Sequence, residues 1–204
     1  MKASLFKLAL LTLSLALLAP ACTRAGSANA RALYADAAQR DPRGKPYIIG
    51  IADVVRVSVF KDESLSTDAI VRPDGTITMP LVGEMKAAGR TAAQLQQDAS
   101  QRLATLVKDA NVTVSIVEVN SYRFTVSGNV ESPGLFTSRY YLTVSEALAL
   151  AGGPNRYADT DEVVVQRVIN GTIYRIPIDY DDIVAGKAPE QDIVILAGDS
   201  VRVP

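Results

Sequence analysis

The stretch VRPDGTITMPLVGEMKAAGRT, residues 71–91, begins with a turn signal. Pro73 fixes one backbone angle, Asp74 can accept a hydrogen bond from its own backbone, and Gly75 readily takes a positive φ. Short β-branched runs flank these three residues on both sides. We therefore expect a hairpin whose turn contains Asp74 and Gly75.

The second half of the stretch leads into a helix. Pro80 and Gly83 interrupt the strand, and the chain then crosses to a new element. Thr91, with Gln94 three residues later, fits a capping box at a helix N-terminus. Apolar residues follow at helical spacing, which predicts one buried face: Ala92, Leu95, Ala99, Leu103 and Leu106. The stretch thus predicts a hairpin, a crossing and a helix start.

Strand patterns surround this helix and then recur around a second one. Alternating apolar residues predict strands at 53–60 and 111–119, and again from Tyr122 to Val126. Thr143 and Glu146 form a second capping box, Gly152 and Gly153 end that helix, and Asn170-Gly171 is a strong hairpin signal. We expect an α+β protein of two modules, residues 47–120 and 121–204.

The composition excludes several classes of protein. Hydrophobic residues make up 48% of the 204 residues, enough for packed cores, and the formal net charge of -1 argues against a nucleic-acid partner. The chain has no His, which excludes a Ser–His–Asp triad and removes the commonest metal ligand. We expect no enzymatic activity, no metal and no cofactor.

The N-terminus resembles an export signal. Residues 1–21 combine a basic start, a short apolar run and small residues, which is typical of a signal peptide. Cys22, the only cysteine, follows directly, as in a bacterial lipoprotein, and we expect it to be acylated at the outer membrane. The alternative is ordinary cleavage after Ala21 or Ala30. Residues 22–46 are expected to form a tether, with a helical turn near 33–38.

Two groups of residues could carry chemistry outside the cores. Carboxylates cluster at 159–162 and 179–182, but they flank strand ends and lack the spacing of a calcium loop, so we expect them to be solvated. Tyr and Arg side chains in loop-like stretches near the second helix are candidate contacts to sugar or to a partner protein, or alternatively packing residues: Arg139, Tyr140, Tyr141, Arg156 and Tyr157.

The first module resembles the outer-membrane polysaccharide export family. YIIGIADVVRVSVF and the quoted stretch are similar to the family patterns Y-x-I-G-x-G-D-x-L-x-I-x-V-(F/W) and V-x-x-D-G-x-I-x-x-P-x-x-G. The matching positions are Gly50, Asp53, Val59, Phe60, Asp74, Gly75, Ile77, Pro80, Gly83 and Thr91. Ala52 stands where the family has Gly, and we expect this to do little harm.

The second module resembles the soluble ligand-binding β-grasp (SLBB) domain of the same family. The patterns G-x-V-x-x-P-G, T-V-x-x-A-L-x-x-A-G-G and G-D-x-V-x-V-P are all present. The matching positions are Gly128, Val130, Pro133, Gly134, Thr143, Ala147, Gly152, Gly153, Gly198, Asp199 and Val203. IADVVRV and AGDSVRV also share the spacing of Asp and Val-Arg-Val.

The resemblance implies a periplasmic part of a polysaccharide export translocon. It implies a homo-oligomeric ring that conducts capsular polysaccharide or exopolysaccharide, and an inner-membrane polysaccharide co-polymerase of the tyrosine autokinase type as partner. Full-length relatives continue into a pore-lining amphipathic helix that this sequence lacks, so we expect a separate outer-membrane β-barrel. The alternative is a monomeric periplasmic carbohydrate-binding lipoprotein.

Overall fold

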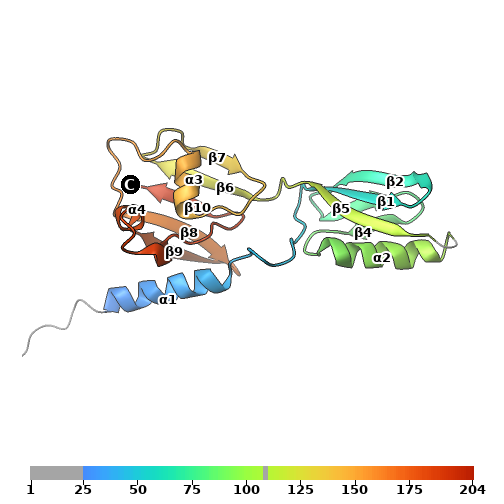
Figure 1. The fold of residues 1–204 in the computed structure, drawn as a ribbon, viewed down its shortest axis with the longest axis horizontal. Helices are drawn as coiled ribbons and strands as arrows, with labels where there is room; N and C mark the ends of the chain where they lie inside the picture. Colours follow the sequence, from blue (N-terminus) through green and yellow to red (C-terminus); the bar gives the residue numbers. More distant parts are fainter. Residues whose placement is uncertain (1–24, 108–109) are drawn as a thin grey trace, which may run out of the picture.

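The computed structural model describes residues 25–107 and 110–204, so Cys22 and the expected signal peptide lie outside the described residues. Figure 1 shows an elongated molecule in which two modules lie end to end. Each module has its own apolar core, the first built around residues such as Val55, Val57 and Leu95, the second around Phe124, Val126 and Val201. The α+β prediction is confirmed.

The first module contains a three-stranded antiparallel sheet and a separate two-stranded sheet. The three-stranded sheet has the order β2-β1-β5, and its central strand turns Val55, Val57 and Val59 inward, as the alternation predicted. The elements are β1 (Val54–Val59), β2 (Asp62–Ile70), β3 (Thr76–Met79), β4 (Gly83–Lys86), α2 (Ala92–Ala104) and β5 (Val112–Glu118).

The turn at Asp74 and Gly75 is present, but the hairpin expected around it is wrong. β2 pairs with β1, whereas β3 pairs with β4 across the turn at 80–82, with Thr76 opposite Lys86 and Met79 opposite Gly83. The unpredicted strand β4 lies where the crossing was expected. The chain leaves the β1–β2 ladder because the Pro73-Asp74-Gly75 turn redirects it, with Arg72 and Thr76 bonded across the turn.

Gly75 is expected to be indispensable for the stability of this module. Its φ is +79°, and a Cβ there would approach Lys86 Nζ to 2.6 Å and the Ala88 Cβ to 2.9 Å. Gly75→Val should therefore lower the free energy of unfolding by about 1–3 kcal/mol, because a β-branched residue resists positive φ. Chemical denaturation measures the change. Gly44→Val is the matched control for backbone strain without crowding, since a Cβ there has nothing within 4 Å. Equal losses in both variants would contradict a role for the close approach.

Helix α2 begins where the capping box predicted. The Thr91 hydroxyl accepts from the Gln94 N–H, and the Gln94 side chain accepts from the Thr91 N–H. Leu95, Ala99 and Leu103 are fully buried against the sheet. The expectation that Leu106 extends this buried face is wrong: the helix ends at Ala104, and Leu106 is 58% exposed.

The second module is built on a mixed five-stranded sheet of order β7-β6-β10-β8-β9. The last strand, β10, is central, parallel to β6 and antiparallel to β8. The β8–β9 hairpin turns at Asn170-Gly171 as predicted, both residues having positive φ. The elements are β6 (Arg123–Gly128), β7 (Gly134–Thr137), α3 (Val144–Leu150), β8 (Val163–Ile169), β9 (Thr172–Ile178), α4 (Tyr180–Val184), the 3-10 helix η1 (Pro189–Gln191) and β10 (Ser200–Val203).

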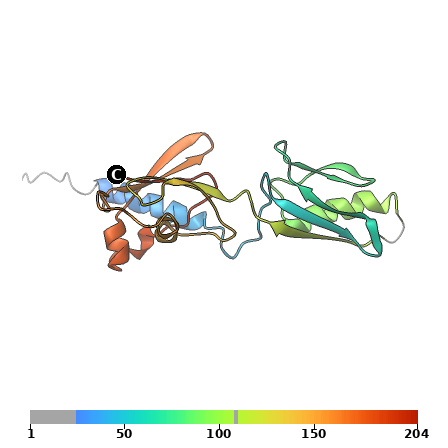
Figure 2. The ribbon, with the colours of Figure 1, turned by 90° about the horizontal axis from the view of Figure 1, so that it is seen from above.

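The segment expected to be a tether contains a helix, α1 (Ala25–Gln39), of 15 residues rather than one turn. Figures 1 and 2 both show α1 lying along the second module, although the first module follows it in the sequence. Ala37 is 3% exposed and belongs to the core of the second module, and the Tyr34 hydroxyl donates to the Pro177 carbonyl at 2.7 Å. Sequence periodicity alone gave little sign of this because the helix is rich in Ala and only weakly amphipathic.

Candidate functional site: the module junction and a pocket in the second module

A buried carboxylate joins the two modules. Asp53 is 0% exposed, and one of its oxygens accepts from the backbone N–H groups of Asn120 and Ser121, both at 2.8 Å. The other oxygen accepts from the Gly50 N–H at 2.7 Å, the Tyr47 hydroxyl at 2.6 Å and the Ser121 hydroxyl at 3.1 Å. Asp53 therefore ties the chain entering the first module to the chain leaving it.

The close packing at this junction explains why position 50 is a glycine and why the Tyr47 hydroxyl stays protonated. A Cβ on Gly50 would collide with the Ser121 side chain, so the two chain segments can meet only where one has no side chain. Burial, together with the hydrogen bond to Asp53, raises the pKa of the Tyr47 phenol. Tyr47 thus remains a hydrogen-bond donor throughout the neutral pH range. The contact holds together the segments by which the chain enters and leaves the first module.

Asp199 occupies the same kind of turn in the second module. Its carboxylate accepts from the Leu196 N–H three residues earlier at 2.7 Å, just as Asp53 accepts from Gly50 at the same separation. The residue before each Asp has positive φ, 74° at Ala52 and 86° at Gly198. The shared sequence spacing of the two segments therefore reflects a shared local structure at the start of β1 and of β10.

The positive φ of Ala52 places backbone strain in this turn, and the expectation that a small residue there does little harm remains a prediction. A non-Gly residue in the left-handed region costs on the order of 1 kcal/mol or more, because its Cβ crowds the backbone. Ala52→Gly should therefore raise the melting temperature of the first module slightly, the gain being reduced by the greater entropy of Gly in the unfolded chain. The reverse change, Gly198→Ala, should lower stability in the second module. Thermal unfolding of both variants tests these two predictions. A lower melting temperature for Ala52→Gly would contradict the strain inferred at Ala52.

Four motif glycines of the second module, Gly128, Gly134, Gly152 and Gly153, lie around one corner of it. Gly128 has positive φ and lies so close to the Val203 carbonyl that any Cβ would clash. The backbone N–H groups of Glu131 and Ser132 bond to the carbonyls of Gly153 and Ala151. The turn before β7, with Pro133 and Gly134, thus packs against the end of α3 at Gly152 and Gly153. These motif positions support the fold of the sheet and helix.

The five candidate contact residues are divided between two ends of the sheet. Arg139 and Tyr140 follow β7, next to the start of β6, and Tyr141 packs edge-on against Tyr122, with ring centroids 5.2 Å apart. Arg156 and Tyr157 lie beyond the other end of β6, where the Asn129 side chain donates to the Tyr157 carbonyl.

Exposure also differs among these residues. Tyr140 and Tyr157 are 75% and 68% exposed, whereas Tyr141 is partly buried. The Arg156 guanidinium lies 4.6 Å from the centre of the Tyr157 ring. The five residues therefore do not form one site. An exposed Tyr stacked with Arg remains available for contact at one end of the sheet, and Tyr140 at the other.

The acidic clusters have structural contacts. Asp179 caps α4 by accepting from the Asp182 N–H, and Asp181 accepts from the Thr160 hydroxyl. A hydrogen bond with Asp161 raises the pKa of Asp159 on the exposed surface. Within residues 25–107 and 110–204, no group of three or more His, Cys, Asp or Glu side chains is placed to hold a metal ion.

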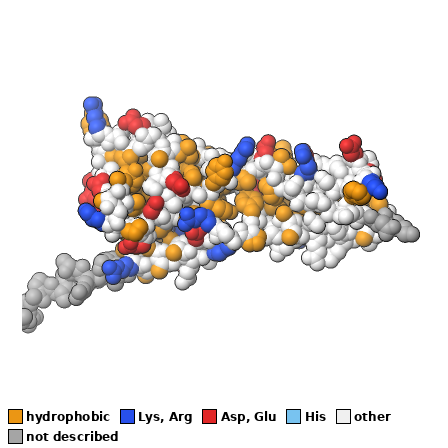
Figure 3. All heavy atoms as spheres, in the orientation of Figure 1, with side chains coloured by type: hydrophobic (Ala, Val, Ile, Leu, Met, Phe, Trp, Pro, Cys, Tyr) orange, Lys and Arg blue, Asp and Glu red, His pale blue; other side chains and the backbone are white. Residues whose placement is uncertain are grey.

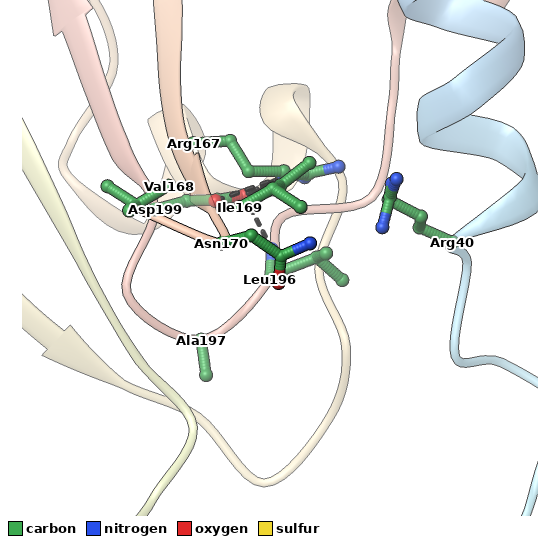
Figure 4. A pocket seen from close by; sticks show the side chains of 8 residues that line it. All are labelled: Arg40, Arg167, Val168, Ile169, Asn170, Leu196, Ala197 and Asp199. Carbon is green, nitrogen blue, oxygen red and sulfur yellow. Dashed lines mark hydrogen bonds and ion pairs between the residues drawn. The ribbon is translucent and has the colours of Figure 1, made fainter. Parts of the chain in front are cut away.

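Sequence reasoning missed a buried cation beside Asp199. Arg167 is 2% exposed and pairs with Asp199 through Nε at 3.1 Å and Nη2 at 2.6 Å, and Nη2 also donates to the Val194 carbonyl at 2.7 Å. A pocket of about 460 Å³ opens beside this pair. Figure 4 shows the residues around it: Arg40, Arg167, Val168, Ile169, Asn170, Leu196, Ala197 and Asp199. The alternation of the sequence could have predicted its burial, since Arg167 continues the inward-facing series of Val163 and Val165 on β8.

The surface carries both signs of charge. Figure 3 shows basic and acidic side chains scattered among apolar ones over both modules, with no large patch of one sign on the face drawn. None of the helices in the described part of the chain is long and apolar enough to cross a membrane.

The fold and its sites define a two-module α+β protein whose buried polar groups secure turns and the junction. Comparison with known proteins identifies the family of each module. Residues 41–117 match the model of the polysaccharide biosynthesis/export protein family, and residues 123–177 match the SLBB domain. The first module therefore belongs to the polysaccharide export family, and the second module is an SLBB domain.

Named relatives agree with this assignment. The chain is 29% identical over 141 residues to the exopolysaccharide production protein ExoF of Rhizobium meliloti, covering 64% of this chain and 33% of that protein. It is 29% identical over 160 residues to the EPS I polysaccharide export outer membrane protein EpsA of Ralstonia solanacearum, covering 67% and 42%. The capsule polysaccharide export outer membrane protein CtrA of Neisseria meningitidis is 27% identical over 134 residues, covering 66% and 33%. The alignments thus span less than half the length of these relatives. The names of these families and relatives refer to the export, biosynthesis or production of polysaccharide.

Proposed function

We propose that this protein is a periplasmic component of a polysaccharide export translocon and carries no catalytic activity. The observation that carries the proposal is the succession of an export module and an SLBB module, joined at the buried Asp53. A rigid junction suits a subunit that must hold its two modules at one angle within an assembly. Its relatives are named for polysaccharide export or production.

The subunits are proposed to form a head-to-tail ring, in which one face of each meets a different face of the next. The ring encloses a hydrophilic passage through which a hydrated polymer slides. An inner-membrane polysaccharide co-polymerase feeds the ring, and an outer-membrane component receives the polymer. Acylation of Cys22 anchors the protein to the periplasmic face of the outer membrane, since several acyl chains give stable attachment. Mass spectrometry of the mature N-terminus tests the anchor. An unmodified terminus, or one beginning at Arg31, contradicts it.

Deletion of the gene tests the function. We expect surface polysaccharide to disappear while polymer synthesis continues, and expression of the intact protein to restore export. Normal export by the deletion strain would contradict the proposal.

Crosslinking tests the ring. Photo-crosslinking amino acids placed at the exposed Tyr140 and Tyr157 report which proteins contact those positions. Self-contacts and a ring-sized particle in detergent support the conduit. A monomer without self-contacts would instead favour a carbohydrate-binding lipoprotein.

A further inference from the structure

Arg167 has two hydrogen-bond donors without a protein partner. A guanidinium carries five N–H groups. The Nε and Nη2 groups bond to Asp199 and Val194, but buried Nη1 finds no acceptor within the part of the chain that the structure describes. An unpaired buried donor is energetically costly, so the site favours any acceptor that can reach it.

The pocket beside Arg167 holds a second cation. Arg40, directly after α1, lines the same pocket, and Figure 4 shows its guanidinium facing that of Arg167 across it. Arg40 donates from Nε and Nη2 to Asp36, which leaves Nη1 as the nitrogen that this ion pair does not use. The charge of Asp199 is already engaged by Arg167 and the Leu196 N–H. Two guanidinium groups therefore face this pocket, and its Asp199 carboxylate is already hydrogen-bonded within the protein.

The rest of the lining suits a saccharide. Val168, Ile169 and Leu196 supply apolar surface, and Asn170 at the hairpin turn supplies an amide. The volume of about 460 Å³ falls within the range of small-ligand pockets. Apolar walls with a few convergent polar groups are typical of such sites, the apolar part covering a ring face and the polar part fixing its orientation.

We propose that this pocket binds the carboxylate of an acidic sugar residue, with Arg167 Nη1 and Arg40 as the two donors. The inference rests on the proposed function, which brings a polysaccharide to this protein. A carboxylate matches the planar donor geometry of guanidinium groups. Asp36 competes with the ligand for Arg40, so the site is expected to hold a sugar weakly and release it, as a moving polymer requires. Because Arg40 lies next to α1 and Arg167 on β8, the site exists only while α1 is docked.

The test is titration of the purified full chain with D-glucuronate, monitored by the NMR signals of the arginine side-chain N–H groups. Glucose, acetate and inorganic phosphate are titrated in parallel. We expect saturable shifts of the Arg167 signal with glucuronate, weaker binding of acetate and phosphate, and none of glucose. Affinity should fall at high ionic strength, because the exposed Arg40 contact is screened.

Variants separate binding from folding. Arg167→Lys keeps a charge for Asp199 but removes Nη1, and should weaken glucuronate binding at least roughly tenfold, the effect of losing a charge-assisted hydrogen bond. Arg40→Gln should weaken it roughly threefold to fivefold, as for an exposed charge. Arg175→Gln, an exposed Arg of β9 outside the pocket, is the matched control and should change nothing. Asp36→Asn should strengthen binding by removing the competitor.

Several results would overturn the inference. These are no saturable binding, equal binding of glucose, equal binding of acetate or phosphate, or affinity unchanged in Arg167→Lys with the fold intact by melting temperature. The outcome is independent of the gene-deletion test. Lost export with no glucuronate binding rejects only the pocket, whereas glucuronate binding with normal export in the deletion strain rejects only the export function.

Discussion

Replacing Asp53 with Ala is expected to lower the free energy of unfolding by about 3–5 kcal/mol, because the change strands buried donors on both sides of the junction. The donors are the backbone N–H groups of Gly50, Asn120 and Ser121 and the hydroxyls of Tyr47 and Ser121. Chemical denaturation measures the loss. The modules should also become mobile against each other, which limited proteolysis near residue 120 detects.

Asp68→Ala is the matched control for this prediction. Asp68 lies in the same module and pairs with Arg56 at 2.6 Å, but both side chains are about half exposed. Exposed pairs contribute about 0–1 kcal/mol, so this variant should remain close to the parent. Similarly small losses in the two variants would show that the hydrogen bonds of Asp53 contribute no more than an exposed ion pair, and would remove the physical basis for a rigid junction.

Replacing Asp199 with Ala should destabilise the second module by a similar amount, about 3–5 kcal/mol, because it leaves the Arg167 charge buried without its partner. Both side chains are almost fully buried, at 3% and 2% exposure, so water cannot compensate. Denaturation of the single variants Asp199→Ala and Arg167→Met, and of the double variant, measures the coupling.

The double variant is the decisive comparison. Removing both charges leaves neither one uncompensated, so its loss should be clearly smaller than the sum of the two single losses. Strict additivity would contradict a coupled pair. The double variant should also abolish binding of glucuronate while retaining the fold, which connects the stability of this pair to the proposed pocket.

Much of the secondary structure could be predicted from short-range sequence signals. Capping boxes at Thr91 and Thr143 start helices where expected, and Asn170-Gly171 turns a hairpin. The alternation around Val55 and Phe124 correctly identified inward faces. These features depend on neighbouring residues and on one periodicity, so the sequence is sufficient to predict them.

The errors arose where a partner distant in the chain decides the outcome. The Asp74-Gly75 turn was recognised, but its strands pair elsewhere, because a turn residue does not select which strand its neighbours bond to. Helix α1 was expected to be a tether, since its Ala-rich sequence has a weak apolar face and its docking surface comes from a module more than 80 residues later. Arg40 lines the pocket beside Arg167 only because α1 packs against the second module.

Neighbouring residues in the chain are enough to specify the turns and helix starts of the two modules and the recurrence of Asp before Val-Arg-Val. The different roles of the two carboxylates, Asp53 at the module junction and Asp199 beside a buried Arg, follow only from the folded arrangement. Both carboxylates sit in the same local turn and accept from the N–H three residues earlier. Their distant partners, Asn120 and Ser121 for Asp53 and Arg167 for Asp199, lie 67, 68 and 32 residues away in the chain. The roles differ because a buried carboxylate is defined by the donors that surround it, and those donors are brought together only by folding.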